Sequence, residues 1–267
     1  MLKEERKNIV LELIRKNKSV RIAELTKMFG VSDETVRRDL TGLEKEGLLR
    51  CVRGGAVYNF STAAEPHVEL RLGKYVREKE AICRQAAEMV KDGESIAIQA
   101  STTALFLGKY LRGKKNLSVV SNSIELANEL MREPTNSVIL TGGSLWLDEQ
   151  KTMGELAETD FKKFRVDKAF ISVTGISPEV GLTEYNEQES RVTKAVLSSA
   201  YATILLNDSS KFDMMAFRKV CDIKQISGII TDWNVSAKDI SLYKDMGIPV
   251  YVCREFSYEE SGESIDK

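Results

Sequence analysis

Polar segments rich in hydroxyl groups follow several short apolar runs in the later part of the chain. After the apolar run at 96–98 comes Gln99-Ala100-Ser101-Thr102-Thr103, directly before a predicted helix. Hydroxyl groups and free backbone N–H groups at such a position bind phosphate and other small anions. Comparable segments after later runs are Ser121-Asn122-Ser123, Thr141-Gly142-Gly143-Ser144, Thr174-Gly175, Asn207-Asp208-Ser209-Ser210-Lys211 and Thr231-Asp232. They suit a small anion that carries hydroxyl groups, such as a sugar phosphate.

These segments also have a structural interpretation, because Ser, Thr and Gly are common in helix caps and turns. Each segment alone is weak, but six segments at one edge of a sheet favour a ligand site. We expect Lys211 to supply the positive charge. The predicted ligand-binding residues are Gln99, Ser101, Thr102, Thr103, Asn122, Ser123, Gly142, Gly143 and Lys211.

Catalysis on such a ligand needs a further group. Moving a proton between sugar carbons requires a positioned carboxylate as base. After the run at 169–172 no carboxylate occurs before Glu179, and Glu184, Glu187 and Glu189 lie where a helix is expected to start. We therefore predict no catalytic residue and no enzyme activity, with a sugar-phosphate isomerase carrying a DNA-binding head as the alternative.

No cofactor and no metal site are expected either. The four cysteines lie far apart without a Cys-x-x-Cys pair, and His67 is the sole histidine. This composition makes a zinc site or a disulfide framework very unlikely and indicates reduced, mostly packed thiols.

The polar segments are positioned by alternating apolar runs and helical stretches. Such alternation predicts an α/β fold with a doubly wound, mostly parallel, Rossmann-like sheet. In this architecture ligands bind at the carboxyl ends of the strands. The predicted strands are at 96–98, 117–120, 138–140, 169–172, 203–206, 228–230 and 250–252, and a helix is predicted from about 78 to 91.

Before these runs, three amphipathic helices are predicted at 4–16, from 22 to Gly30, and from Ser32 to Gly47. The small Thr26 and Gly30 fit two helices that meet across a tight turn, where bulk would push them apart. This pattern is typical of a helix-turn-helix. The segment at 48–57, two apolar runs about Gly54-Gly55, predicts a β-hairpin wing.

The third helix of this winged helix-turn-helix would enter the major groove of DNA. The predicted DNA-binding residues are Ser32, Thr35, Arg37 and Arg38 on that helix, and Arg50 and Arg53 on the wing. Winged helices also serve as protein-interaction modules, and that alternative stays open. Asp39 would either orient one of the arginines or be a solvated acid.

Charge and length agree with two domains. Residues 1–58 hold 13 Lys and Arg against 9 Asp and Glu, and the remainder holds 26 against 31. A basic front on an acidic body favours a polyanion partner for the first part only. For the 267 residues we predict a head at 1–58, a linker at 59–75 and a ligand-binding domain at 76–267. A charged start without a long apolar run predicts a soluble, cytoplasmic chain with no membrane partner.

The string Thr35-Val36-Arg37-Arg38-Asp39-Leu40, with Val31-Ser32 before it and Arg53-Gly54-Gly55-Ala56 after it, resembles the head of the DeoR family of bacterial transcriptional regulators. The later part resembles that family's sensor domain at Ser101-Thr102-Thr103, Ser121-Asn122-Ser123, Asp208-Ser209-Ser210-Lys211-Phe212 and Ile230-Thr231-Asp232. The family usually has Asp-x-Gly-Thr-Thr where this chain has Gln99-Ala100-Ser101-Thr102-Thr103, which puts the usual ligand specificity in doubt.

The resemblance implies a domain similar to ribose-5-phosphate isomerase and a phosphorylated sugar as effector. The resulting prediction is a transcriptional regulator, in the form of a repressor of a carbohydrate-utilisation operon. Its expected partners are double-stranded operator DNA, a small phosphorylated sugar, and further copies of itself in a homodimer or higher oligomer, because bacterial operators usually match two-fold symmetry.

Overall fold

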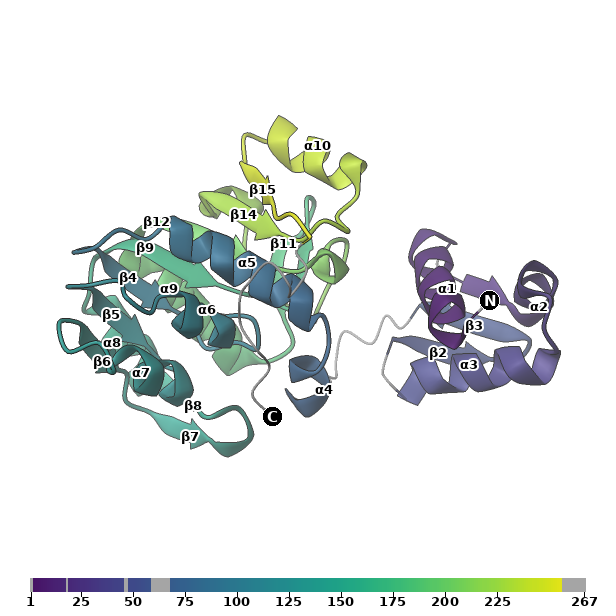
Figure 1. Cartoon of the computed structure of the whole chain (residues 1–267), viewed down its shortest axis with the longest axis horizontal. Coiled ribbons are helices and arrows are strands. Elements are labelled where there is room, and N and C mark those ends of the chain that lie inside the picture. Colours follow the sequence, from purple (N-terminus) through teal and green to yellow (C-terminus); the bar gives the residue numbers. More distant parts are fainter. Residues whose placement is uncertain (1, 18, 46–47, 59–67, 256–267) are drawn as a thin grey trace. The chain divides into compact units, whose positions relative to one another are not determined.

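The structure is a computed structural model of the chain, and it describes residues 2–17, 19–45, 48–58 and 68–255. The chain divides into two compact units, residues 1–70 and 71–267, which we call the head and the body (Figure 1). Within the predicted linker, residues 59–67 and with them His67 lie outside the described residues. Residues 68–72 form helix α4 (Val68–Leu72).

The head contains the three predicted helices, α1 (Lys3–Asn17), α2 (Ile22–Phe29) and α3 (Asp33–Lys45), and their apolar stripes form one core. Gly30 ends α2 with φ of 65°. A Cβ at Gly30 would meet no atom within 4 Å. Our expectation that bulk at Gly30 would separate the helices is therefore wrong, because the turn needs the left-handed conformation of glycine and not its small size.

The wing is a three-stranded antiparallel sheet. Strands β2 (Leu49–Val52) and β3 (Gly55–Tyr58) form the predicted hairpin, and β1 (Ser19–Arg21), which the sequence pattern does not predict, pairs with β3. Gly54 has φ of 88° in the turn, whereas a Cβ at Gly55 would lie 2.0 Å from the carbonyl oxygen of Val20. Gly54 therefore makes the turn, and Gly55 lets β1 approach.

All seven predicted runs in the body form strands of one parallel sheet, in the order β15-β14-β12-β9-β4-β5-β6. Ile96 and Ile98 point into one core while Ala97 points into another, so the sheet is buried on both faces. The strands are β4 (Ser95–Ile98), β5 (Ser118–Ser121), β6 (Ser137–Leu140), β9 (Val166–Ile171), β12 (Ala200–Leu206), β14 (Gly228–Thr231) and β15 (Val250–Val252).

Helices cover both faces of this sheet (Figure 1). The face of Ile96 packs against α5 (Val76–Glu88), α6 (Leu105–Tyr110) and α7 (Ile124–Leu130). The face of Ala97 packs against α8 (Glu155–Lys162), α9 (Glu187–Ser199) and α10 (Ala237–Asp245). The predicted fold class, a winged helix-turn-helix followed by a doubly wound, mostly parallel sheet, is confirmed.

Two small antiparallel sheets were not predicted. Strands β7 (Ser144–Trp146) and β8 (Lys151–Met153) form a hairpin around the 3-10 turn η1 (Leu147–Glu149). Strands β10 (Gly175–Ser177), β11 (Gly181–Glu184) and β13 (Arg218–Cys221) form the other. The 3-10 turns η2 (Ser209–Lys211) and η3 (Ile223–Gln225) complete the body.

Candidate functional site

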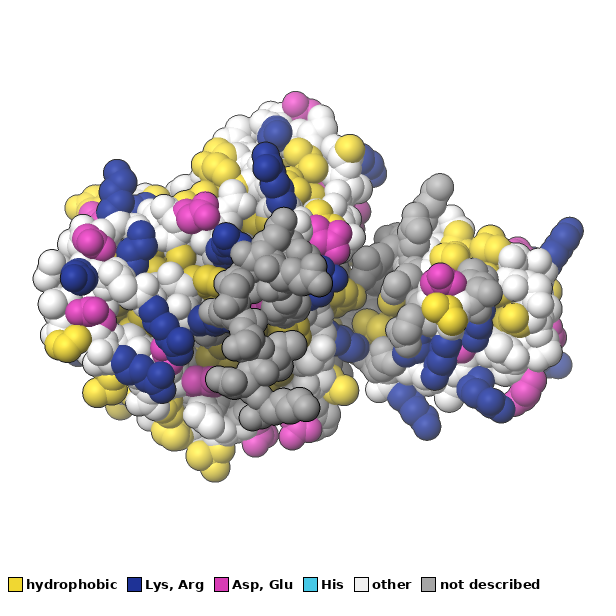
Figure 2. All heavy atoms as spheres, viewed as in Figure 1, with side chains coloured by type: hydrophobic (Ala, Val, Ile, Leu, Met, Phe, Trp, Pro, Cys, Tyr) yellow, Lys and Arg dark blue, Asp and Glu magenta, His cyan; other side chains and the backbone are white. Residues whose placement is uncertain are grey.

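Polar residues before and within α3, the predicted recognition helix, fix the start of this helix. The hydroxyl of Ser32 accepts a hydrogen bond from the backbone N–H of Thr35 at 3.3 Å, and Thr26 Oγ1 donates to Asp33 Oδ1 at 2.8 Å. Arg37 and Arg38 are exposed, whereas Val36 and Leu40 are buried in the head core. Figure 2 shows Lys and Arg side chains gathered over the α3 side of the head. Both guanidinium groups are thus accessible to a phosphate backbone.

Asp39 is neither a solvated acid nor a partner of these arginines. It is buried, and its carboxylate accepts from Arg6 Nε of α1 at 2.7 Å. A residue on the inner face of α3 turns away from its exposed neighbours, so Asp39 joins α1 to α3 and leaves Arg37 and Arg38 uncommitted to it.

The wing presents its two arginines to solvent. Arg50 lies in β2 opposite Val57, and Arg53 lies in the turn just before Gly54. Both side chains are exposed, as a contact with DNA backbone would require.

In the body, the predicted polar segments follow strands of the parallel sheet and therefore share its carboxyl edge. Gln99 is buried there and links three elements: its Nε2 donates to Thr193 Oγ1 of α9 at 2.7 Å, and its Oε1 accepts from the backbone N–H of Ser172 at 3.3 Å. Gln99, which stands where the family pattern usually has Asp, therefore joins the loops after β4 and β9 to α9.

Several other predicted residues also make internal hydrogen bonds. Asn122 accepts from the N–H of Ala100 at 2.8 Å and donates to the carbonyl of Thr152 at 3.0 Å. Ser101 and Ser123 accept from Ala104 N–H at 3.0 Å and Leu126 N–H at 3.2 Å. Ser123 is thus the N-cap of α7, whereas Ser101 closes the turn before α6, and Thr102 and Thr103 are buried in that same loop.

Local backbone contacts account for Gly142 and Gly143. The N–H of Gly142 donates to Asp160 Oδ2 at 2.8 Å. Gly143 has φ of 133°, and a Cβ there would lie 2.3 Å from the carbonyl oxygen of Met153. Close backbone approach to the β7–β8 hairpin therefore explains Gly143 without a ligand.

The loop after β12 carries the predicted lysine. Asp208 is buried and accepts from Ser210 N–H at 3.0 Å, while the buried Asp232 accepts from Ser209 N–H at 2.6 Å. Lys211 is partly exposed, and within the described residues no carboxylate lies at ion-pair distance from its ammonium group. Two buried carboxylates thus bind the backbone of this loop, which ends in Lys211.

A second lysine at this edge was missed by sequence reasoning. Lys79 of α5 is 3% exposed and donates to the carbonyl of Arg71. Burial lowers the pKa of Lys79 to about 8; Asp208 opposes this shift, and Lys211 adds to it. Lys79 lies one turn before Cys83, whose thiol contacts the 99–103 loop. The signal was available, because Lys79 precedes the apolar residues Ile82, Cys83 and Ala86 by three, four and seven positions, the spacing of one helix face.

A third lysine, Lys151 of β8, is buried between two carboxylates. Its ammonium pairs with Glu149 at 2.9 Å and with Glu189 of α9, and lies 5.1 Å from the centre of the Trp146 ring. Glu149 also pairs with Arg71 at 3.0 Å. Burial lowers the pKa of Lys151, but the charges of Glu189 and Glu149 outweigh it and hold the pKa above its ordinary value.

Of the three acids expected where a helix starts, Glu187 and Glu189 lie in the first turn of α9, whereas Glu184 lies before it in β11. Glu184 is buried at the end of β11 and accepts from Thr174 Oγ1 at 2.6 Å, and Glu189 is buried against Lys151. The β10–β11 hairpin, which the pattern did not predict, folds Glu184 back over the loop after β9. Both carboxylates are engaged by protein partners.

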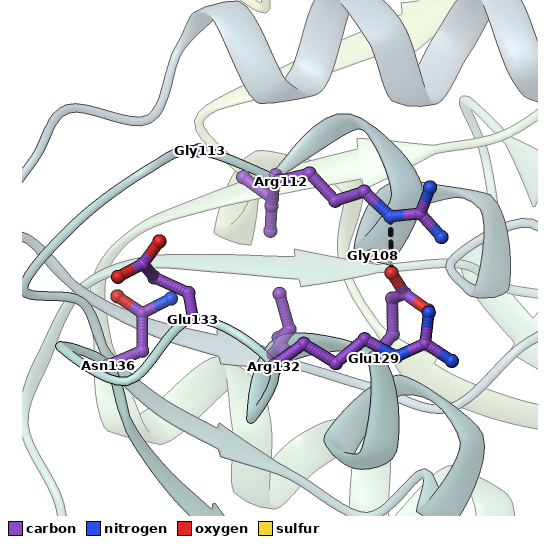
Figure 3. Close-up of a pocket in the computed structure, with 9 residues that line it drawn as sticks. Gly108, Arg112, Gly113, Glu129, Arg132, Glu133 and Asn136 are labelled. Atoms are coloured by element: carbon purple, nitrogen blue, oxygen red, sulfur yellow. Dashed lines mark hydrogen bonds and ion pairs between the residues drawn. The ribbon is translucent and has the colours of Figure 1, made fainter.

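A pocket of about 150 Å³ lies between the carboxyl ends of α6 and α7, away from the predicted site (Figure 3). In Figure 3 the side chains of Arg112 and Arg132 converge on Glu129. The pocket adjoins the starts of β5 and β6, the opposite edge of the sheet, and its charges already neutralise one another.

The four cysteines are free, and Cys83, Cys221 and Cys253 are buried. Burial raises the pKa of Cys253 to about 12 and that of Cys221 to about 11, so these thiols stay protonated. Among the described residues, no three His, Cys, Asp or Glu side chains cluster as metal ligands would. No helix in the described ranges has the length and apolar character to cross a membrane.

Taken together, a winged helix with exposed arginines and an α/β unit with a polar carboxyl edge define a transcriptional regulator with a sensor domain. Two family profiles match the chain: the DeoR-like helix-turn-helix domain at residues 6–62 and the DeoR C-terminal sensor domain at residues 74–233. The chain belongs to the DeoR family.

Relatives align over nearly the whole chain. The HTH-type transcriptional regulator YulB of Bacillus subtilis is 35% identical, covering 94% of this chain and 96% of its own. GolR of Listeria innocua is 32% identical, covering 93% and 98%, and the glycerol-3-phosphate regulon repressor of Escherichia coli is 29% identical, covering 95% and 100%. These three relatives are named transcriptional regulators or repressors, which agrees with the family of the chain.

Among solved structures, ribose 5-phosphate isomerase A from Neisseria gonorrhoeae aligns with a TM-score of 0.37 and 19% identity, over 50% of this chain and 52% of that one. The β subunit of eIF2B from Chaetomium thermophilum aligns with a TM-score of 0.41 and 13% identity, over 74% and 62%.

Proposed function

We propose that this regulator is a cytoplasmic repressor of a carbohydrate-utilisation operon and that a phosphorylated sugar modulates its affinity for operator DNA. The observation that carries the proposal is the pair of lysines at the carboxyl edge of the sheet, Lys79 and Lys211, beside the hydroxyl-rich loop of Thr102 and Thr103. The charge of Lys211 lowers the pKa of Lys79, and a bound anion near both lysines would offset that repulsion.

The roles of the other predicted residues follow from their bonds. The phosphate and the sugar would be held by Thr102, Thr103, Lys79 and Lys211. We propose that Gln99, Ser101, Asn122 and Ser123 contribute to ligand binding by ordering the loops. Gly142 would contribute through its backbone N–H, and Gly143 through its close approach to the β7–β8 hairpin.

The relatives' names agree with this class of effector. The E. coli relative is named for glycerol-3-phosphate, a phosphorylated polyol, and another E. coli relative is named a putative repressor of the aga operon. We propose that Arg37 and Arg38 contact DNA in the major groove, with Ser32 and Thr35, and that Arg50 and Arg53 contact the backbone beside it.

Thermal unfolding of the full chain against matched sugars and sugar phosphates tests the effector class. A ligand at about 100 times its Kd adds about 2.7 kcal/mol to the free energy of unfolding. We expect a phosphorylated sugar to stabilise the wild type, but not Lys211→Ala. Stabilisation by an unphosphorylated sugar alone, unchanged in Lys211→Ala, would overturn the proposed phosphate site.

A further inference from the structure

The strand β6 ends the seven-stranded sheet, and its outer backbone is unpaired. The N–H groups of Ser137 and Thr141 donate to carbonyls at 117 and 121 on the β5 side. In a strand, the backbone N–H and C=O groups of successive residues point to opposite sides. The groups of Val138 and Leu140 therefore point away from β5, to the outer side of the sheet. Within the described residues, no hydrogen bond reaches either of these outer N–H groups.

This edge lacks the usual protection against strand pairing. Native edge strands are commonly blunted by charges, proline or a covering element. The segment 137–143 contains no charged residue and no proline, and Ile139 and Leu140 are 36% and 42% exposed. The opposite edge strand, β15, is flanked by Pro249 before it and by Arg254 and Glu255 after it.

Apolar side chains continue beside β6. Leu145, Leu147 and Leu156 are 50%, 77% and 64% exposed. Leu156 of α8 is adjacent to the strand end, since its Cβ lies 3.8 Å from where a Cβ at Gly142 would be. Figure 2 shows apolar side chains along the border of the body that carries β6 and the β7–β8 hairpin. An exposed apolar border next to an open strand edge is typical of an association surface.

A second copy of this chain fits the edge better than an unrelated strand would. When a strand pairs antiparallel with the same strand of a second copy, the two copies are related by a two-fold axis. Segment 137–143 carries no charge, so two copies of it do not repel each other. A two-fold body would also supply the pair of heads that an operator with two-fold symmetry requires.

We propose that two copies associate through β6, antiparallel about Ile139, so that the two sheets become continuous. Val138 of each copy then exchanges both backbone hydrogen bonds with Leu140 of the other, and the two Ile139 residues form the central pair without hydrogen bonds. The proposal deepens the proposed function by naming the surface that pairs the heads. Its tests need neither DNA nor effector, so either account can fail alone.

Cysteine cross-linking tests this register in the full chain. Residues in a non-hydrogen-bonded antiparallel pair have Cα atoms about 4.5 Å apart, within the range of about 4.4 to 6.8 Å that a disulfide spans. We expect Ile139→Cys to form a covalent dimer under mild oxidation. The matched control is Tyr251→Cys, the centre of β15, where the side chain is 38% exposed; it and the wild type should remain monomeric on a non-reducing gel.

Sedimentation of the purified full chain provides the second measurement. Leu140→Lys should weaken self-association by at least about tenfold, because it puts a charge opposite the apolar Val138 of the other copy and places the two introduced charges diagonally across the strand pair on one face. Tyr201→Lys adds the same charge at an 82% exposed site in β12 and should leave association unchanged. A monomeric wild type, cross-linking through Tyr251→Cys in place of Ile139→Cys, or an unaffected Leu140→Lys oligomer would overturn the proposal.

Discussion

The thiol of Cys83 donates a hydrogen bond to the backbone carbonyl of Thr103 at 3.0 Å, which fastens α5 to the hydroxyl-rich loop after β4. Lys79 is one turn away on the same face of α5, and its pKa responds to Asp208 and Lys211 on the loop after β12. Helix α5 therefore connects two loops that are distant in sequence, one through the thiol of Cys83 and the other through the charge of Lys79.

Lys79 should make stability depend on pH in a recognisable way. Its pKa is about 8 in the folded chain and has the ordinary value of 10.5 when unfolded. Between these values the unfolded state binds more protons, so the free energy of unfolding rises with pH. Urea unfolding at about pH 7 and about pH 10 should show wild type gaining about 1 to 3 kcal/mol relative to Lys79→Met. An equal difference at both pH values would contradict the buried cation.

The same lysine should control effector affinity. A bound phosphate favours protonated Lys79, so above about pH 8 binding must be accompanied by proton uptake, and affinity should fall towards tenfold per pH unit. Calorimetric titration with the stabilising sugar phosphate measures this directly. Lys79→Met should bind the ligand more weakly at about pH 7, and its affinity should not fall as the pH rises. A wild-type affinity that stays constant up to about pH 9.5 would show that Lys79 does not contact the ligand.

The exposed arginines of α3 should act on DNA alone. Arg37→Ala or Arg38→Ala should weaken binding to a duplex by about 1 to 3 kcal/mol if the guanidinium reads a base, and reduce the salt slope by about 1 if it neutralises a phosphate. Anisotropy titrations at several salt concentrations distinguish the two. Lys27→Ala, at an exposed position on α2, is the control. Unchanged DNA affinity in both arginine variants would favour a protein-interaction role for the head.

The wing glycines should tolerate different replacements. Gly54→Asn should cost less than about 1 kcal/mol, because asparagine adopts the left-handed conformation. Gly55→Ala should destabilise the head more than Gly54→Asn does, because its Cβ would overlap the carbonyl of Val20 at 2.0 Å. Thermal unfolding of both variants compares them, and equal stability would contradict the β1–β3 contact.

The buried pair of Lys151 and Glu189 should show strong coupling. Lys151→Met leaves buried carboxylates without their cation and should destabilise the body by about 3 to 5 kcal/mol. Adding Glu189→Gln should recover part of this loss, since the uncompensated charge is removed. Urea unfolding of the two single variants and the double variant measures the coupling, and additive effects would show that the pair is not an energetic unit.

Sequence patterns predicted the seven strands of the sheet because parallel strands that are buried on both faces appear as continuous apolar runs. They did not predict β1 or the β10–β11 hairpin, since three- and four-residue strands show little periodicity and their partners lie far along the chain. Glu184 was misjudged and Lys79 was missed for the same reason, since the burial of each depends on tertiary contacts. Glu184 contacts Thr174, and Lys79 interacts with the loop after β12. The places of Lys211, Thr102 and Thr103 after strands were predicted from the sequence, and their contact with a ligand stays a prediction.

The central claim is that a ligand at the carboxyl edge of the sheet changes how the heads bind DNA. We would measure the anisotropy of a labelled operator duplex, chosen by selection from a random pool, against the full chain with and without the stabilising sugar phosphate. Coupling between two sites is commonly worth about 5- to 150-fold, and we predict a change of at least about tenfold in operator Kd. Lys211→Ala should bind the operator normally and show no change. An operator Kd that the saturating ligand leaves unaltered in the wild type would contradict the account.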